Sequence, residues 1–130
     1  ERVQPAGMTS APWPLLMAGI LLVACSGAPD PLDKVQFDLG RLDIHGLQGP
    51  ADGKSSLSYE FCTPNTTEAR TEVAAADPSV RFSCSSPGRI GCDPGECLSL
   101  GDSYRQDHRQ RLLGLAVLPY IRRIEESFFE

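Results

Sequence analysis

The sequence lacks the motifs that identify the common catalytic classes. It contains no glycine-rich phosphate loop, no serine nucleophile elbow and no metalloprotease helix. Histidines are scarce, and we expect both to be surface or packed side chains, because His45 lies in a turn-rich stretch and His108 on the apolar stripe of a predicted helix. Asp93 and Glu96 flank a Pro-Gly turn, where acidic residues are usually solvated. We therefore predict no catalytic residue, no metal site and no cofactor, and we expect that the protein is not an enzyme.

Positive charge is also scarce, because the formal net charge of the chain is −5. A nucleic-acid partner would need a basic surface, so we expect no such partner. The arginines of the C-terminal third could form a patch for an anionic partner. The interpretation that we favour is a solvated helix face, in which acidic neighbours balance these arginines. The arginines are Arg105, Arg109, Arg111, Arg122 and Arg123, and the acids are Asp107, Glu125 and Glu126.

The longest apolar run, at 15–24, is too short for a membrane-spanning helix, which takes about 20 residues. A run of about ten apolar residues with small residues at its end and an abrupt polar exit is typical of a secretory signal peptide. The alternative is a buried core helix or strand. Pro12 and Pro14 just before the run make this alternative weaker. We therefore predict a signal peptide that ends at residue 24.

The residues Leu22-Val23-Ala24-Cys25 at the end of this run resemble the lipobox of bacterial lipoprotein signal peptides. The resemblance implies that the chain is cut before Cys25 and that the Cys25 thiol carries a diacylglyceryl group, which anchors the protein to a membrane. It also implies a location in the cell envelope, facing the periplasm or the exterior. In Gram-negative lipoproteins an Asp after the cysteine retains the protein in the inner membrane. Ser26 stands there in this chain, so the outer membrane is favoured.

The number of cysteines supports the same compartment. The chain has five, and lipidation of Cys25 leaves Cys62, Cys84, Cys92 and Cys97 for two disulfides. We favour Cys62 with Cys97 and Cys84 with Cys92, because the first and third strands of the expected sheet are neighbours. The open alternative joins Cys92 to Cys97 and Cys62 to Cys84. Metal binding is the competing use, but Cys92 and Cys97 lack the tight spacing of a zinc knuckle.

The composition divides the chain into four parts. Residues 1–24 hold the signal peptide and the residues before it. Residues 25–33 form the lipid anchor and a tether rich in proline and glycine. Residues 34–56 form a turn-rich lead-in, and the alternation of apolar and polar residues at 35–39 predicts a short strand at its start. Residues 57–130 form the folded domain.

Residues 57–130 carry alternating strand and helix patterns. Asn65 and Glu68 form a capping box at the start of the first predicted helix. Asp102 or Ser103 should cap the second helix, which a proline ends. The expected elements in chain order are a strand at 57–62, a helix at 66–76, strands at 80–84, 89–92 and 97–100, a helix through 112–117 and a final strand from Tyr120 onward.

This order of elements predicts an α+β fold. Two split βαβ units in series make a ferredoxin-like βαββαβ sandwich, with two helices on one face of an antiparallel sheet. A small irregular domain rich in disulfides is the alternative. A packed part of about 75 residues buries too little apolar surface for high stability. Disulfides would therefore stabilise either fold.

Two functions from different classes fit these expectations. The first is an envelope-anchored lipoprotein whose small, non-enzymatic domain binds another envelope protein or a small ligand. The second is a protease-regulating module similar to a propeptide or an inhibitor, which would face the enzyme with its sheet and reach it with residues 126–130. The predicted lipid anchor at Cys25, the tether and the missing catalytic motifs favour the first.

Overall fold

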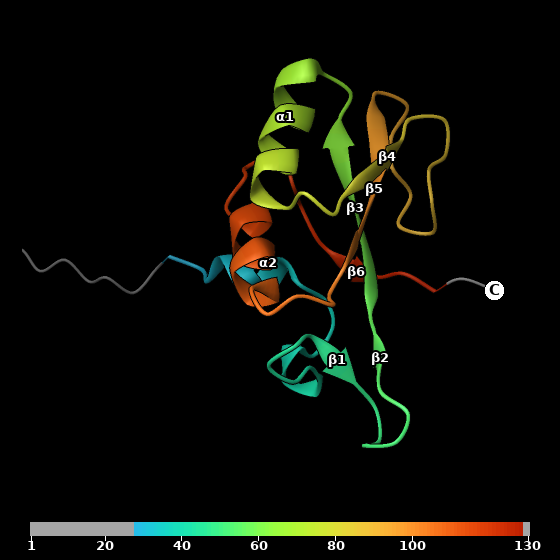
Figure 1. Ribbon diagram of the computed structural model, residues 1–130. Helices are drawn as coiled ribbons and strands as arrows, with labels where there is room; N and C mark the ends of the chain where they lie inside the picture. The colour runs from blue at the N-terminus through green and yellow to red at the C-terminus, as the bar shows by residue number, and fades with distance from the viewer. Residues whose placement is uncertain (1–27, 129–130) are drawn as a thin grey trace, which may run out of the picture.

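The protein has an α+β architecture. Two helices pack beside a four-stranded antiparallel sheet, and a short two-stranded antiparallel ribbon extends from one end of the molecule (Figure 1). The predicted α+β class is therefore confirmed. This computed structural model describes residues 28–128, so Cys25 and the predicted signal peptide lie outside the described residues. No helix within residues 28–128 is long and apolar enough to cross a membrane.

The sheet is built around two long central strands, β3 (Ser58–Pro64) and β5 (Glu96–Asp102). These strands pair antiparallel along their whole length. Two short strands, β4 (Arg81–Ser83) and β6 (Glu125–Glu126), pair antiparallel with β5 and β3 and complete the order β4-β5-β3-β6. Both central strands and β4 lie where the alternation of apolar residues predicts them.

The last strand is shorter than the sequence predicts, because the backbone of Ile124 forms hydrogen bonds with the lead-in. The N–H of Ile124 donates to the carbonyl oxygen of Lys34 (2.8 Å), and the N–H of Gln36 donates to the carbonyl oxygen of Ile124 (2.8 Å). Val35 and Ile124 form a single parallel bridge. The strand predicted at 35–39 is reduced to this bridge, and only β6 continues onto β3.

The two helices differ from the predictions at their starts. Helix α1 (Thr67–Ala76) is capped by Thr66, whose hydroxyl accepts from the Ala69 N–H at 3.1 Å, and not by Asn65. Helix α2 (His108–Ala116) starts later than a cap at Asp102 or Ser103 would allow. Asp102 belongs to strand β5. The Ser103 side chain is buried and makes other hydrogen bonds. The helix ends before Pro119, as predicted.

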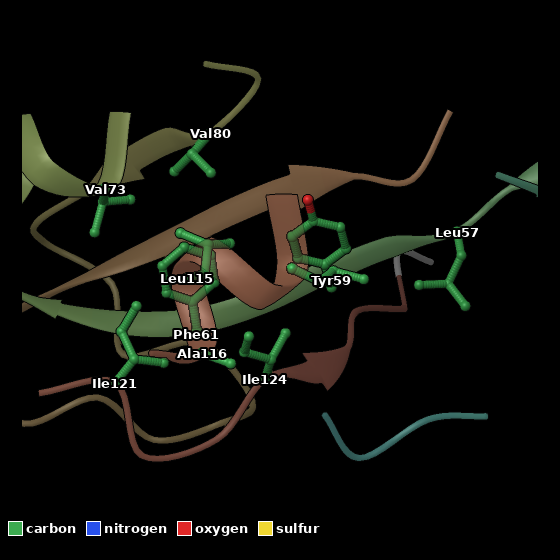
Figure 2. Close-up of a cluster of buried hydrophobic side chains, with 10 residues drawn as sticks. Leu57, Tyr59, Phe61, Val73, Val80, Leu115, Ala116, Ile121 and Ile124 are labelled. Atoms are coloured by element: carbon green, nitrogen blue, oxygen red, sulfur yellow. The ribbon is translucent and has the colours of Figure 1, made fainter. Parts of the chain in front are cut away.

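Both helices cover the same face of the sheet, where the main core lies (Figures 1 and 2). Side chains alternate across a strand, so Tyr59 and Phe61 of β3 point to this face. They meet apolar side chains from both helices and from the segment that follows α2. The buried cluster consists of Leu57, Tyr59, Phe61, Val73, Val80, Leu112, Leu115, Ala116, Ile121 and Ile124.

The opposite face of the sheet is covered by the loop 84–95, which contains no helix and no strand. A second, smaller cluster forms there from Cys62 and Leu98 on the sheet with Ile90 and Cys92 on the loop. The strand predicted at 89–92 does not form. The chain makes turns there, and the N–H of Cys92 donates to the Pro87 carbonyl oxygen at 2.8 Å.

The lead-in is packed against the domain. It contains the 3-10 helix η2 (Leu39–Arg41) and the ribbon strands β1 (Leu47–Gln48) and β2 (Ser55–Ser56). A further 3-10 helix, η1 (Pro31–Lys34), precedes it where the sequence predicts the end of a tether. The ring of Phe37 stacks on that of Tyr59, with centroids 6.3 Å apart. Leu32 of η1 also packs against the main core, and the lead-in side chains packed there are Val35, Phe37, Leu39 and Leu42.

Candidate functional site

A groove of about 700 Å³ lies between the lead-in and the start of α2. One wall comes from η2 and the turn after it, and the other comes from the residues around the N-terminus of the helix. Ile44 stands at the rim with 75% of its surface exposed, which is unusual for a large apolar side chain. The lining residues are Leu39, Leu42, Asp43, Ile44, Gln106, Asp107, His108, Arg109 and Gln110.

The lead-in wall is held in place through Gly46. This residue has a φ of +80°, and a Cβ on it would lie 1.6 Å from the carbonyl oxygen of Ser103. Only glycine fits there. The buried Ser103 hydroxyl donates to the Gly46 carbonyl oxygen at 2.7 Å and accepts from the Leu57 N–H at 2.8 Å. The wall is therefore fixed to the segments that flank α2 and β3.

Asp43 shapes the same wall. Its carboxylate accepts from the Lys54 ammonium (2.8 Å) and from the N–H groups of His45 (2.8 Å) and Leu47 (3.0 Å). The hydrogen bond from Lys54 and these N–H groups hold the pKa of Asp43 well below its usual range. The carboxylate stays ionised, but its charge is balanced by Lys54. The apolar side chains therefore dominate this wall.

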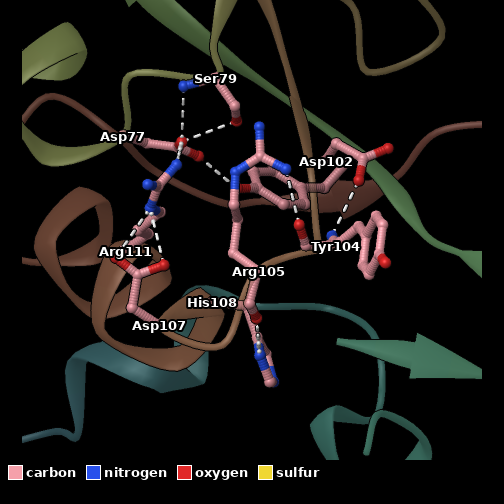
Figure 3. Close-up of polar contacts among 9 residues, drawn as sticks. Asp77, Ser79, Asp102, Tyr104, Arg105, Asp107, His108 and Arg111 are labelled. Carbon is pink, nitrogen blue, oxygen red and sulfur yellow. Dashed lines mark hydrogen bonds and ion pairs between the residues drawn. The ribbon is translucent and has the colours of Figure 1, made fainter. Parts of the chain in front are cut away.

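The helix wall contributes one buried polar side chain, His108, which is 5% exposed. Its Nδ1 lies 2.8 Å from the Arg105 carbonyl oxygen, and its ring is directed away from the neighbouring Asp77 cluster (Figure 3). Among residues 28–128, Nε2 makes no hydrogen bond. No side chain caps α2, because the carboxylate of Asp107 binds Arg111 instead, with 3.0 Å between its Oδ1 and Nε. The groove thus combines apolar walls with a few hydrogen-bonding groups.

A buried polar cluster beside the groove joins β3, the end of α1 and α2 (Figure 3). Asp77 accepts from the Tyr59 hydroxyl, from the Ser79 hydroxyl (2.7 Å) and from the Arg111 guanidinium (3.2 Å). Burial and the nearby Asp77 carboxylate raise the pKa of Tyr59 far above its usual value. Because Tyr59 and Asp77 are both fully buried, this cluster serves the fold.

The sequence patterns did not predict this cluster. The sequence feature that could have indicated it is the glycine paired with Tyr59 on the neighbouring strand β5. A Cβ on this glycine, Gly101, would lie 2.4 Å from the tyrosine ring. A glycine opposite a tyrosine in two predicted strands indicates a ring that lies across the neighbouring strand. The buried hydroxyl then needs a partner. Asp77 directly follows the helix predicted at 66–76, and no contact was predicted for its side chain.

The predicted use of four cysteines in disulfides is confirmed, but both pairings considered are wrong. Cys62 is joined to Cys92, and Cys84 is joined to Cys97. The reason is the register of the sheet, in which Cys97 lies opposite Thr63. Neighbouring residues on a strand point to opposite faces, so Cys62 and Cys97 cannot meet although their strands are adjacent.

Because they are in disulfides, Cys62 and Cys92 cannot bind a metal ion as thiolates. Cys62, Cys92 and Glu96 present ligand atoms within 4.8 Å of one another. Both sulfur atoms are bonded to each other and offer no thiolate. The Glu96 carboxylate accepts from the Asp93 N–H (2.8 Å) and from Arg122 (3.2 Å). These contacts outweigh the effect of burial and lower the pKa of Glu96. The Glu96 carboxylate is therefore held by the Asp93 backbone and by Arg122.

The arginines mostly form ion pairs, as the favoured interpretation predicts. Arg111 binds Asp107, Arg122 binds Glu96, and Arg123 binds Glu125. Glu126 pairs with Arg41 of the lead-in, which the sequence analysis did not consider. His45 lies in an exposed turn, where its N–H binds Asp43.

Comparisons with known proteins give no relative. The sequence matches no family model, and no curated protein and no solved structure is significantly similar to it.

Proposed function

We propose that this chain is a bacterial envelope lipoprotein that is anchored through a lipidated Cys25 and carries a small, non-enzymatic binding domain. The support for the anchor is the lipobox-like sequence Leu22-Val23-Ala24-Cys25 after a short apolar run. The support for an exported domain is the pair of disulfides, which persist in oxidising compartments. Ser26 after the cysteine favours the outer membrane in a Gram-negative cell, with the domain facing the periplasm.

We further propose that residues 57–130 form a ferredoxin-like sandwich. Its support is the chain order β3-α1-β4-β5-α2-β6 together with the sheet order β4-β5-β3-β6. Both helices lie on one face, as that fold requires (Figure 1). The proposal extends only to the fold, because one fold carries many functions.

The groove between the lead-in and α2 is the proposed binding site, and its apolar walls are the observation that carries the proposal. Grooves that bind a partner are mostly apolar and contain a few polar groups. Here Leu39, Leu42 and Ile44 give the apolar surface, and His108 gives an imidazole nitrogen without a partner among residues 28–128. A partner that covers Ile44 would remove its exposed side chain from water. An envelope protein or a small apolar ligand fits this surface.

The proposal that the domain is not an enzyme is supported by the partners of its potentially reactive side chains. The four cysteines of the domain are in disulfides. Tyr59 and Asp77 are buried against each other, and Glu96 is held by Arg122. Each of these groups has a structural partner, so none is positioned as a free nucleophile or base.

The protease-regulating alternative receives less support. It relies on a sheet face that is open to the enzyme. The loop 84–95 packs over the face of β3 and β5 that the helices leave free. The groove at α2 is therefore the preferred contact surface.

A photo-crosslinking amino acid placed at Ile44 tests the groove. The full chain would be made in bacteria and irradiated in intact cells, and the matched control would carry the same group at the exposed Ser85 of the loop 84–95. We expect a discrete adduct from position 44 and none from position 85. Equal labelling from both positions, or none from position 44, would reject the groove as a binding site.

A further inference from the structure

An apolar patch lies beside the point where the described chain begins. Leu113 of α2 and Val117, the C-cap residue of that helix, are four residues apart and share one side of it, and they are 41% and 55% exposed. Next to them, a hollow of about 330 Å³ is lined in part by Pro29, Pro31 and Val117. We call Pro29, Pro31, Leu113 and Val117 the anchor-side patch.

The start of the described chain is fixed to this end of α2. The Asp30 side chain accepts from the Leu32 N–H at 2.9 Å and caps η1. The Lys34 ammonium donates to the Leu118 carbonyl oxygen at 3.2 Å, just beyond the helix. The Lys34 carbonyl oxygen accepts from the Ile124 N–H at 2.8 Å. Therefore η1 cannot move away from the end of α2 without breaking the two hydrogen bonds of Lys34.

The distance from the anchor is short. Four residue steps separate Cys25 from Pro29, and a fully extended chain covers at most about 14 Å in four steps. The sheet lies behind the helices, and a helix with its side chains is about 10 Å across. A membrane that holds Cys25 can therefore reach the patch more easily than the loop 84–95 on the far face of the sheet.

We propose that the anchor-side patch rests on the lipid surface that holds the acyl chains of Cys25. This inference depends on the proposed function, since it needs the lipid anchor. Leu113 and Val117 then leave water at the interface, and α2 is fixed relative to the membrane. The groove lies at the other end of α2, around residues 106–110, so it stays open to a partner.

The charges around the patch indicate the kind of lipid. Asp30 and the exposed Asp33 lie beside it, and the Lys34 ammonium is already bonded to a backbone oxygen. Acidic side chains are repelled by anionic lipids. The patch therefore fits a zwitterionic surface such as phosphatidylethanolamine, and added anionic lipid is expected not to strengthen its contact.

Tryptophan fluorescence of the full lipidated chain tests this contact. The only tryptophan is Trp13, upstream of the predicted cleavage point, so the mature protein would have none. A single tryptophan is introduced as Val117→Trp, or as Leu113→Trp if the first variant fails to form its disulfides. The control is Phe128→Trp, an exposed aromatic position on the segment that leaves β6 on the other side of the molecule from η1 (Figure 1). The proteins are placed in vesicles of phosphatidylethanolamine and phosphatidylcholine with brominated acyl chains, which quench a tryptophan that enters the interface.

We expect position 117 or 113 to lose most of its emission and to shift to shorter wavelength, while position 128 keeps the emission of an exposed ring. Equal quenching at both positions, or none at position 117 and position 113, overturns the inference. The intact mass of each sample is measured in parallel. A lipidated protein without selective quenching leaves the proposed anchor standing and removes only the contact. A protein without acyl chains removes both.

Discussion

The two faces of the sheet are stabilised in different ways. On the helix-covered face, the side chains of β3 pack against α1, α2 and the segment after α2, and the cluster contains large aliphatic and aromatic residues. On the loop-covered face, Ile90 is the large apolar side chain that the loop 84–95 contributes, and a disulfide joins Cys62 to Cys92. The two helices bury enough apolar surface to be held against the sheet by packing alone. A loop without a helix or strand needs a covalent bond.

The two faces also differ in what their buried acidic side chains bind. Asp77 on the helix-covered face is surrounded by hydroxyl groups and a guanidinium group. Glu60 on the loop-covered face binds the Ile90 N–H at 3.0 Å and the Ser127 hydroxyl at 3.3 Å. The first acid joins elements that already pack together. The second holds a loop and the C-terminal segment that have few other contacts with the sheet, so we expect the loop to be the first part to open.

Truncating one leucine on each face gives the largest expected difference. Leu115 is fully buried among the helices and β3, and Leu98 lies at the edge of the loop cluster. We expect Leu115→Ala to lower the free energy of unfolding by about 4 kcal/mol, because it leaves a closed cavity, and Leu98→Ala to lower it by about 2 kcal/mol. Urea denaturation measures both. Equal losses would contradict the comparison.

Removing one disulfide at a time tests the loop directly. The chain-entropy relation gives about 3.5 kcal/mol for the Cys62–Cys92 bond, with a sequence separation of 30, and about 3 kcal/mol for the Cys84–Cys97 bond, with a separation of 13. We expect the Cys62→Ser, Cys92→Ser double variant to show fast amide exchange at 84–95 while the helices stay protected. The Cys84→Ser, Cys97→Ser variant is the comparison, because it releases only the first residue of the loop. Equal protection of the loop in both variants would show that the bond to Cys92 does not hold it.

Alkaline pH should weaken the helix-covered face by a smaller amount. The pKa of Tyr59 is raised in the folded protein, so its contribution to stability is complete below the unfolded value of about 10 and is lost as the pH rises towards the folded value. The loss is about 1.4 kcal/mol at about pH 11. Tyr59→Phe should remove this part of the pH dependence, whereas Tyr104→Phe, at an exposed position, should leave it unchanged. The same alkaline slope in wild type and Tyr59→Phe would contradict the assignment.

The sequence predicts the parts of the fold that depend on local patterns. The alternation at 57–62 and at 97–100 locates β3 and β5, and the helix predicted at 66–76 coincides with α1. The disulfide pairing could not be predicted, because it depends on a register offset of one residue between β3 and β5. A single sequence does not determine that offset.

The candidate site was harder to predict than the fold. Its lead-in wall contains Leu39, Leu42 and Ile44, which the sequence places in a turn-rich segment ahead of the domain. Packing of this segment against α2 depends on contacts far apart in sequence, such as the Ser103 hydroxyl with Gly46. His108 was expected on the apolar stripe of a helix, and it is buried there, but its open Nε2 becomes visible only beside the groove.

The most direct test of an anchored, disulfide-bonded envelope protein is the intact mass of the chain from detergent-solubilised bacterial membranes, before and after reduction and alkylation. We predict a mass that starts at Cys25 and includes acyl chains, four alkylations only after reduction, and peptides that link Cys62 to Cys92 and Cys84 to Cys97. A chain without acyl groups, or four thiols that are alkylated without reduction, would contradict the account.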